Sequence, residues 1–78
     1  MEIYLKKLLF KASHRGTKEM DIILGSFAEK NLETMNEENL KLFEEILEIP
    51  DPDLYKWFTS EDVSIPEKYT ALVKEISK

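Results

Sequence analysis

A six-residue segment between two stretches of helical apolar spacing combines charged, polar and conformationally free residues. Its members are His14, Arg15, Gly16, Thr17, Lys18 and Glu19. Because glycine reaches backbone angles that other residues avoid, Gly16 predicts a sharp turn. Arg15 and Glu19 flank that turn with opposite charges, and a planar guanidinium suits bidentate hydrogen bonding to another macromolecule. The segment predicts either a corner that docks on a partner or, more simply, a C-cap glycine with solvated neighbours.

The other residues that carry chemistry form no catalytic or metal-binding pattern. The chain has no cysteine and one histidine, His14, which argues against a disulfide framework and a zinc centre. Neighbouring helix positions do not face each other, so His14 and the adjacent Ser13 are no nucleophile–base pair. The two glycines cannot form a dinucleotide-binding loop, and the carboxylates are expected on solvated surfaces, unsuited to general acid work. We therefore expect a protein that is not an enzyme, with no metal and no tightly bound cofactor.

Charge is distributed unevenly along the chain. Residues 1–18 carry +4, residues 19–62 carry −10 and residues 63–78 carry +1, which sum to the net charge of −5. Binding to phosphates needs a positive surface, so the acidic middle argues against a nucleic-acid partner. The basic first segment could be a local docking face, although lysines that solvate the outside of a helix are the simpler interpretation.

No apolar run approaches the roughly 18 residues of a membrane span, so we expect no membrane association. The first ten residues lack the long apolar region and the cleavage site of a signal peptide, and they do not resemble a transit peptide. These features favour the bacterial cytoplasm, or the mitochondrial matrix for a processed chain.

The spacing of apolar residues predicts an all-α fold, a compact bundle of five short helices in a single domain over residues 1–78. The expected helices are residues 2–14, ended by Gly16; a second from near Thr17; a third after Asn36; 53–58; and a fifth from Pro66, preceded by a polar loop over 59–64. The expected inward residues are Leu5, Leu8, Leu9, Ala12, Met20, Ile23, Leu24, Phe27, Ala28, Leu40, Phe43, Leu47, Tyr69, Leu72, Val73 and Ile76.

Several helix boundaries carry capping signals. Asn36 is expected as an N-cap, with Met35 and Leu40 forming a hydrophobic staple across it. The third helix should stop before Pro50, because a residue that precedes proline disfavours the α conformation. Asp51 then fits an N-cap, followed by Pro52 at the first helical position, where its missing N–H costs nothing.

A second informative segment runs from Pro50 to Trp57. Its members include Asp51, Pro52, Asp53, Leu54 and Trp57. Prolines restrict the unfolded chain, and an indole can supply much buried area in a small core. Taken alone, the segment is explained by structure, with Leu54 and Trp57 as anchors to the bundle.

Together the two segments resemble the succinate dehydrogenase assembly factor family, also called the flavinator or SdhE family. The resemblance covers nearly the whole chain and includes Arg15-Gly16-x-x-Glu19, Leu8-Leu9-Phe10, residues 21–28 and 40–47, and Asp51 through Trp57. It departs from the family at Thr17, where many relatives have Met, and at Phe58-Thr59-Ser60, where many have a glycine turn.

The resemblance implies a small chaperone-like assembly factor that binds the flavoprotein subunit of succinate dehydrogenase or fumarate reductase. It implies that FAD becomes covalently attached to a histidine of that subunit, so the cofactor is handled on the partner. Arg15, Gly16 and Glu19 match the motif that meets the flavoprotein, with His14, Thr17 and Lys18 beside them and residues 51–57 in a secondary role. We expect a monomer when the protein is free. An antitoxin-like or other small interaction protein is the alternative.

Overall fold

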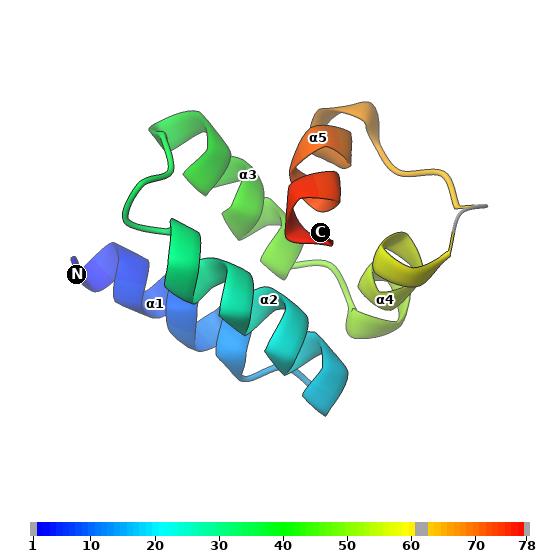
Figure 1. The fold of residues 1–78 in the computed structure, drawn as a ribbon, viewed down its shortest axis with the longest axis horizontal. Helices are drawn as coiled ribbons and strands as arrows, with labels where there is room; N and C mark the ends of the chain where they lie inside the picture. Colours follow the sequence, from blue (N-terminus) through cyan, green and yellow to red (C-terminus); the bar gives the residue numbers. More distant parts are fainter. Residues whose placement is uncertain (1, 61–62, 78) are drawn as a thin grey trace.

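Five helices form the regular secondary structure of residues 2–60 and 63–77, the part of the chain that the computed structural model describes (Figure 1). They are α1 (Ile3–Ser13), α2 (Lys18–Asn31), α3 (Glu37–Leu47), α4 (Asp51–Thr59) and α5 (Glu67–Ile76). No strand occurs in these two ranges. The expected all-α class and the order of five short helices are confirmed.

The helices are arranged as an antiparallel pair with three further helices packed around it. In Figure 1, α1 and α2 run side by side in opposite directions, joined by the turn at residues 14–17. Helix α3 contacts both α1 and α5, and α5 also contacts α2 and α4. Figure 1 also shows that the short helix α4 lies at the same end of the molecule as the α1–α2 turn. The candidate site depends on this placement.

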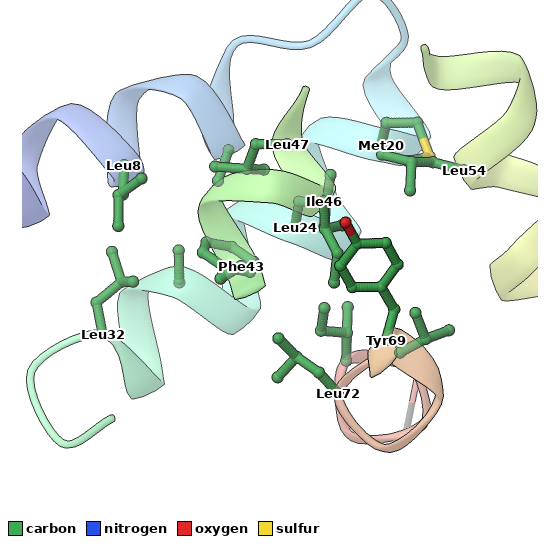
Figure 2. Packing of buried hydrophobic residues seen from close by; sticks show 14 of the residues in the cluster. Leu8, Met20, Leu24, Leu32, Phe43, Ile46, Leu47, Leu54, Tyr69 and Leu72 are labelled. Carbon is green, nitrogen blue, oxygen red and sulfur yellow. The ribbon is translucent and has the colours of Figure 1, made fainter. Parts of the chain in front are cut away.

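The core is one apolar cluster to which every helix contributes (Figure 2). Phe43 of α3 lies near its centre, and Met20 of α2 and Leu54 of α4 point toward one another at one end. The buried residues are Leu5, Leu8, Ala12, Met20, Leu24, Ala28, Leu32, Phe43, Ile46, Leu47, Leu54, Tyr69, Leu72, Val73 and Ile76. Most of the expected inward stripe is confirmed, while Leu9, Ile23, Phe27 and Leu40 are only half-buried at its edge.

Two glycine positions allow backbones or side chains to approach closely. A Cβ on Gly25 of α2 would lie 3.0 Å from Ser13 Oγ and 3.4 Å from Ser13 Cα, so this glycine sets the close contact of α1 and α2. Gly16 has no positive φ, and the expectation that it turns the chain through a conformation reserved for glycine is wrong. The Gly16 backbone instead lies against the Asp51 side chain, which leaves little room for a Cβ.

Capping explains where α2 and α3 begin. The Thr17 side chain accepts a hydrogen bond from Met20 N at 3.3 Å, and the Asn36 side chain accepts one from Asn39 N at 2.8 Å. Both satisfy backbone donors that a helix start leaves without an internal partner. The expected N-cap at Asn36 and the expected start of the second helix near Thr17 are therefore confirmed.

The start of α4 differs from the sequence-based expectation. Pro50 occupies the N-cap position, Asp51 is the first helical residue and Pro52 the second, so the predicted N-cap role of Asp51 is wrong. The Asp51 carboxylate makes no cap hydrogen bond, because it is held by Arg15 and Gly16 instead. Helix α4 also runs to Thr59, which removes that residue from the expected loop at 59–64; residues 61 and 62 of that loop lie outside the described residues.

The other helix limits fall close to prediction. Helix α1 is one residue shorter at each end than the expected 2–14, and His14 rather than Gly16 is its C-cap. Helix α3 ends at Leu47, before Pro50, and Pro66 is the N-cap of α5 rather than its first residue. Trp57 is half-buried, with its ring centroid 6.0 Å from that of Tyr69, so the deep anchor of α4 is Leu54 and not the indole.

Candidate functional site

The Arg15 guanidinium ties the α1–α2 turn to the α3–α4 turn. Its Nε donates to Asp51 Oδ1 at 2.7 Å, and its two terminal nitrogens donate to the carbonyl oxygens of Leu47 at 2.5 Å and Ile49 at 2.8 Å. The arginine side chain is only 11% exposed and the aspartate side chain 17%. The guanidinium that the sequence suggested for a partner thus makes its hydrogen bonds within the chain.

Asp51 is the second half of this connection. While Oδ1 accepts from Arg15, Oδ2 accepts from the backbone N of Gly16 at 2.6 Å. A Cβ on Gly16 would lie 2.9 Å from the same Oδ2, closer than real Cβ contacts allow. A larger residue at position 16 would therefore have to displace the Asp51 carboxylate from this position, a constraint that the sequence alone did not reveal.

Asp21 is a third member that sequence reasoning missed. Its Oδ1 accepts from the backbone N of Arg15, which closes the turn between α1 and α2 from the other side. Asp21 also lies in the first turn of α2, where the helix dipole favours an anion. No spacing rule relates a loop N–H to a carboxylate six residues later, so the pattern carried no signal for this bond.

The remaining residues of the segment 14–19 face outward. Lys18 and Glu19 are exposed in the first turn of α2, and Thr17 is exposed while it caps the helix. His14 stacks on Phe10, with ring centroids 4.0 Å apart and an angle of 17° between the planes. Arg15 and Gly16 thus hydrogen-bond to Asp51 within the chain, although Gly16 is itself exposed, and His14, Lys18 and Glu19 lie where a neighbour can reach them.

Glu19 borders an open hollow between the starts of α2 and α4. The lining residues are Thr17, Glu19, Met20, Asp51, Pro52 and Tyr55. Pro52 is exposed, and Tyr55 is 44% exposed despite its size. Tyr55 was not among the predicted site residues, although its place one turn beyond Asp51 on a short helix could have indicated it.

The expected second segment is divided between two surfaces. Asp51 and Pro52 border the hollow beside Glu19, whereas Asp53 and Trp57 line another depression, together with Tyr69 of α5. Leu54 lies between them and is fully buried. The structure therefore brings only Asp51 and Pro52 to the corner formed by residues 14–19.

No catalytic or metal-binding arrangement emerges from the described residues. No group of three or more histidine, cysteine, aspartate or glutamate side chains is placed to hold a metal ion within residues 2–60 and 63–77. Glu45 is a carboxylate whose pKa is lowered, and its contacts are with α5 and not with residues 14–19. Hydrogen bonds from Tyr69 and Lys68 favour its charged form. In the same two ranges, no helix has the length and apolar character needed to span a bilayer.

Comparison with known proteins assigns the chain to a family. Residues 6–78 match the family model described as "Flavinator of succinate dehydrogenase". The chain belongs to this flavinator family.

Individual members of the flavinator family are similar over most of the chain. It is 42% identical over 71 residues to the "FAD assembly factor SdhE" of Acetobacter pasteurianus, covering 91% of this chain and 65% of that protein. It is 35% identical to the mitochondrial "Succinate dehydrogenase assembly factor 2" of Dictyostelium discoideum, covering 91% of this chain and 50% of that protein. The counterpart in Arabidopsis thaliana is 32% identical, with coverages of 95% and 42%. The chain thus spans about two fifths to two thirds of the length of these relatives.

Proposed function

We propose that this protein is an assembly factor that binds the flavoprotein subunit of succinate dehydrogenase and promotes the covalent attachment of FAD to it. The family match over residues 6–78 carries this proposal, and the names of the relatives in bacteria and mitochondria support it. The flavoprotein subunit of fumarate reductase is a second client of the same kind. The protein acts as a monomer in the bacterial cytoplasm, or in the mitochondrial matrix if it derives from a processed precursor.

The corner at residues 14–19 is the surface that meets the flavoprotein. Arg15, Gly16 and Asp51 give it a fixed shape, because three hydrogen bonds join the guanidinium to the α3–α4 turn. Glu19, Lys18, Thr17 and His14 are exposed on it. Glu19 has the clearest role, since its carboxylate borders the hollow beside Pro52 and is accessible to donors of a partner.

The protein acts by positioning the reacting groups of its partner, and the bond forms between the flavin and a histidine of that partner. Covalent attachment requires these two groups in a near-attack geometry, and holding reactants in such a geometry lowers the barrier considerably. A bundle that binds one arrangement of the flavoprotein more tightly than others shifts the population toward it. FAD is handled on the partner flavoprotein, which this chain binds.

Flavin attachment in a cell that lacks its own assembly factor tests the proposal. The wild-type chain should restore the covalent flavin fluorescence of the flavoprotein subunit on a denaturing gel, and a pull-down should recover that subunit. Glu19→Gln should reduce both signals, whereas Glu29→Gln, an exposed change on the same helix, should leave them unchanged. Full attachment without the chain, or recovery of a toxin instead of a flavoprotein, would contradict the proposal.

A further inference from the structure

The outward face of α1 combines exposed apolar and basic side chains in one stripe. Positions 3, 6, 7, 10 and 14 follow the helical period and lie opposite the buried residues Leu5, Leu8 and Ala12. Ile3 is 73% exposed and Phe10 62% exposed, the two largest values among the large hydrophobic residues. The α1 face, as we call it, consists of Ile3, Lys6, Lys7, Phe10 and His14.

The lysines of the α1 face form no ion pair within the described part of the chain. The ion pairs found in residues 2–60 and 63–77 join Lys11 to Glu48, Arg15 to Asp51 and Lys68 to Glu45, and none includes Lys6 or Lys7. The protein as a whole has a net charge of −5. A positive patch on an acidic protein orients it toward a negatively charged partner, because the local field differs in sign from the rest of the surface.

Phe10 has the properties of an anchor at such a patch. Its ring is stacked on His14, and the backbone oxygen of Phe10 lies 2.9 Å from His14 Nδ1, so both rings are held while they remain exposed. A held aromatic side chain loses little conformational entropy when a partner covers it, and aromatic residues are enriched among the contacts that dominate binding.

The α1 face is continuous with the corner assigned to the flavoprotein. Phe10 and His14 line one open groove with Arg15, Gly16 and Asp51. A partner seated on the corner therefore reaches Phe10 without any change in the bundle. The groove explains how the two surfaces would act as one interface.

We propose that the α1 face is a second contact surface for the flavoprotein, and that it binds an acidic patch of that subunit with an apolar side chain seated against Phe10. This inference rests on the proposed function and deepens it by stating the chemistry of the partner surface. Anionic lipid is the other ligand that a basic, partly apolar helix face can bind. A protein surface fits better, because only two large apolar side chains are present and the net charge of −5 opposes approach to an anionic bilayer.

Binding kinetics with the purified flavoprotein subunit of succinate dehydrogenase test this inference. Lys6→Glu combined with Lys7→Glu should lower the association rate constant about tenfold or more at low salt, and raising the salt should narrow this difference. Phe10→Ala should weaken the affinity about tenfold, mainly through faster dissociation. Lys30→Glu with Lys74→Glu, and Ile22→Ala, are the matched changes at exposed positions on other helices and should have little effect.

The outcomes separate this inference from the proposed function. If the wild type binds, and the α1-face variants lose no more association rate or affinity than the control variants, the inference is overturned and the proposed function stays intact. No binding by the wild type would contradict the proposed function and the inference with it. Sedimentation of the wild type, but not of Lys6→Glu with Lys7→Glu, with phosphatidylserine–phosphatidylcholine vesicles would assign the α1 face to a membrane and also overturn the inference.

Discussion

Arg15 Nε lies 2.7 Å from Asp51 Oδ1, and this pair joins two turns that are separated by 36 residues of sequence. The same guanidinium also binds the carbonyl oxygens of Leu47 and Ile49, which end α3 and lead into α4. Because each side chain is less than one fifth exposed, neither group can exchange its partner for water without a rearrangement. The corner of the molecule is therefore held by a charged pair and not by apolar packing alone.

Arg15→Ala should destabilise the protein as well as reduce its function. The change leaves the partly buried Asp51 carboxylate without its cation and frees two carbonyl oxygens, a loss of about 2–4 kcal/mol in the free energy of unfolding. Urea unfolding followed by circular dichroism measures this loss. Arg15→Lys should recover only part of it, because an ammonium cannot span three acceptors. A urea midpoint equal to that of the wild type would show that the pair is not structural.

Gly16→Ala should be harmful only while Asp51 is present. The new Cβ would lie 2.9 Å from Asp51 Oδ2, and relief of that contact should cost about 1–2 kcal/mol in unfolding free energy. In the Asp51→Ala background the same change should cost less than about 0.5 kcal/mol, since φ at Gly16 is not positive. A double-mutant cycle by urea unfolding measures the coupling, and equal costs in both backgrounds would contradict the steric explanation.

Leu54→Ala should destabilise the protein more than Trp57→Ala. Leu54 is fully buried against the core, so its truncation should cost about 2–5 kcal/mol in unfolding free energy. Trp57 is half-buried beside Tyr69, and its removal should cost about 1–3 kcal/mol. Thermal and urea unfolding of the two variants provide the comparison. The reverse order would mean that the indole carries more of the core than its exposure indicates.

Stability should fall in acid partly through Glu45. The Tyr69 hydroxyl donates to Glu45 Oε1 at 2.7 Å and Lys68 Nζ lies 3.2 Å from it, and these contacts lower the pKa of Glu45 below its ordinary 4.5. A lowered pKa in the folded state contributes stability above the unfolded pKa, and this contribution is lost as the pH falls through the folded pKa. Glu45→Gln should therefore unfold at lower urea than the wild type at about pH 7, and the difference should close as the pH falls through the folded pKa of Glu45.

A matched change controls the prediction for Glu45. Glu29→Gln removes one exposed carboxylate from α2, so its urea midpoint should follow the wild type across the same pH range. If Glu45→Gln also followed the wild type throughout, the Tyr69–Glu45–Lys68 contact would not contribute to folding in solution.

Helical spacing was sufficient to predict the number, order and approximate limits of the helices. In α5, for example, Tyr69, Leu72, Val73 and Ile76 repeat at the helical period, and all four are buried. Local capping chemistry was equally informative, as at Asn36, because an N-cap and its partner N–H are three residues apart. These features depend on residues only a few positions apart in the chain, and such relationships can be read directly from the sequence.

The roles of Arg15, Gly16 and Asp51 could not be predicted in the same way. The sequence suggested an exposed guanidinium, a glycine with unusual backbone angles and an N-cap aspartate, whereas the folded chain joins the three in one internal contact. Each suggestion was locally reasonable. It failed because the α1–α2 turn and the α3–α4 turn meet only after the helices pack.

The sequence by itself determined the class of fold, the helix order, the core stripes and the resemblance that leads to the flavinator family. Only the tertiary structure decided which charges of the corner are engaged within the chain and which remain exposed, as Glu19 does. The physical reason is that helix formation and burial follow the period of the chain, while a hydrogen bond across 36 residues depends on where packing places its two ends.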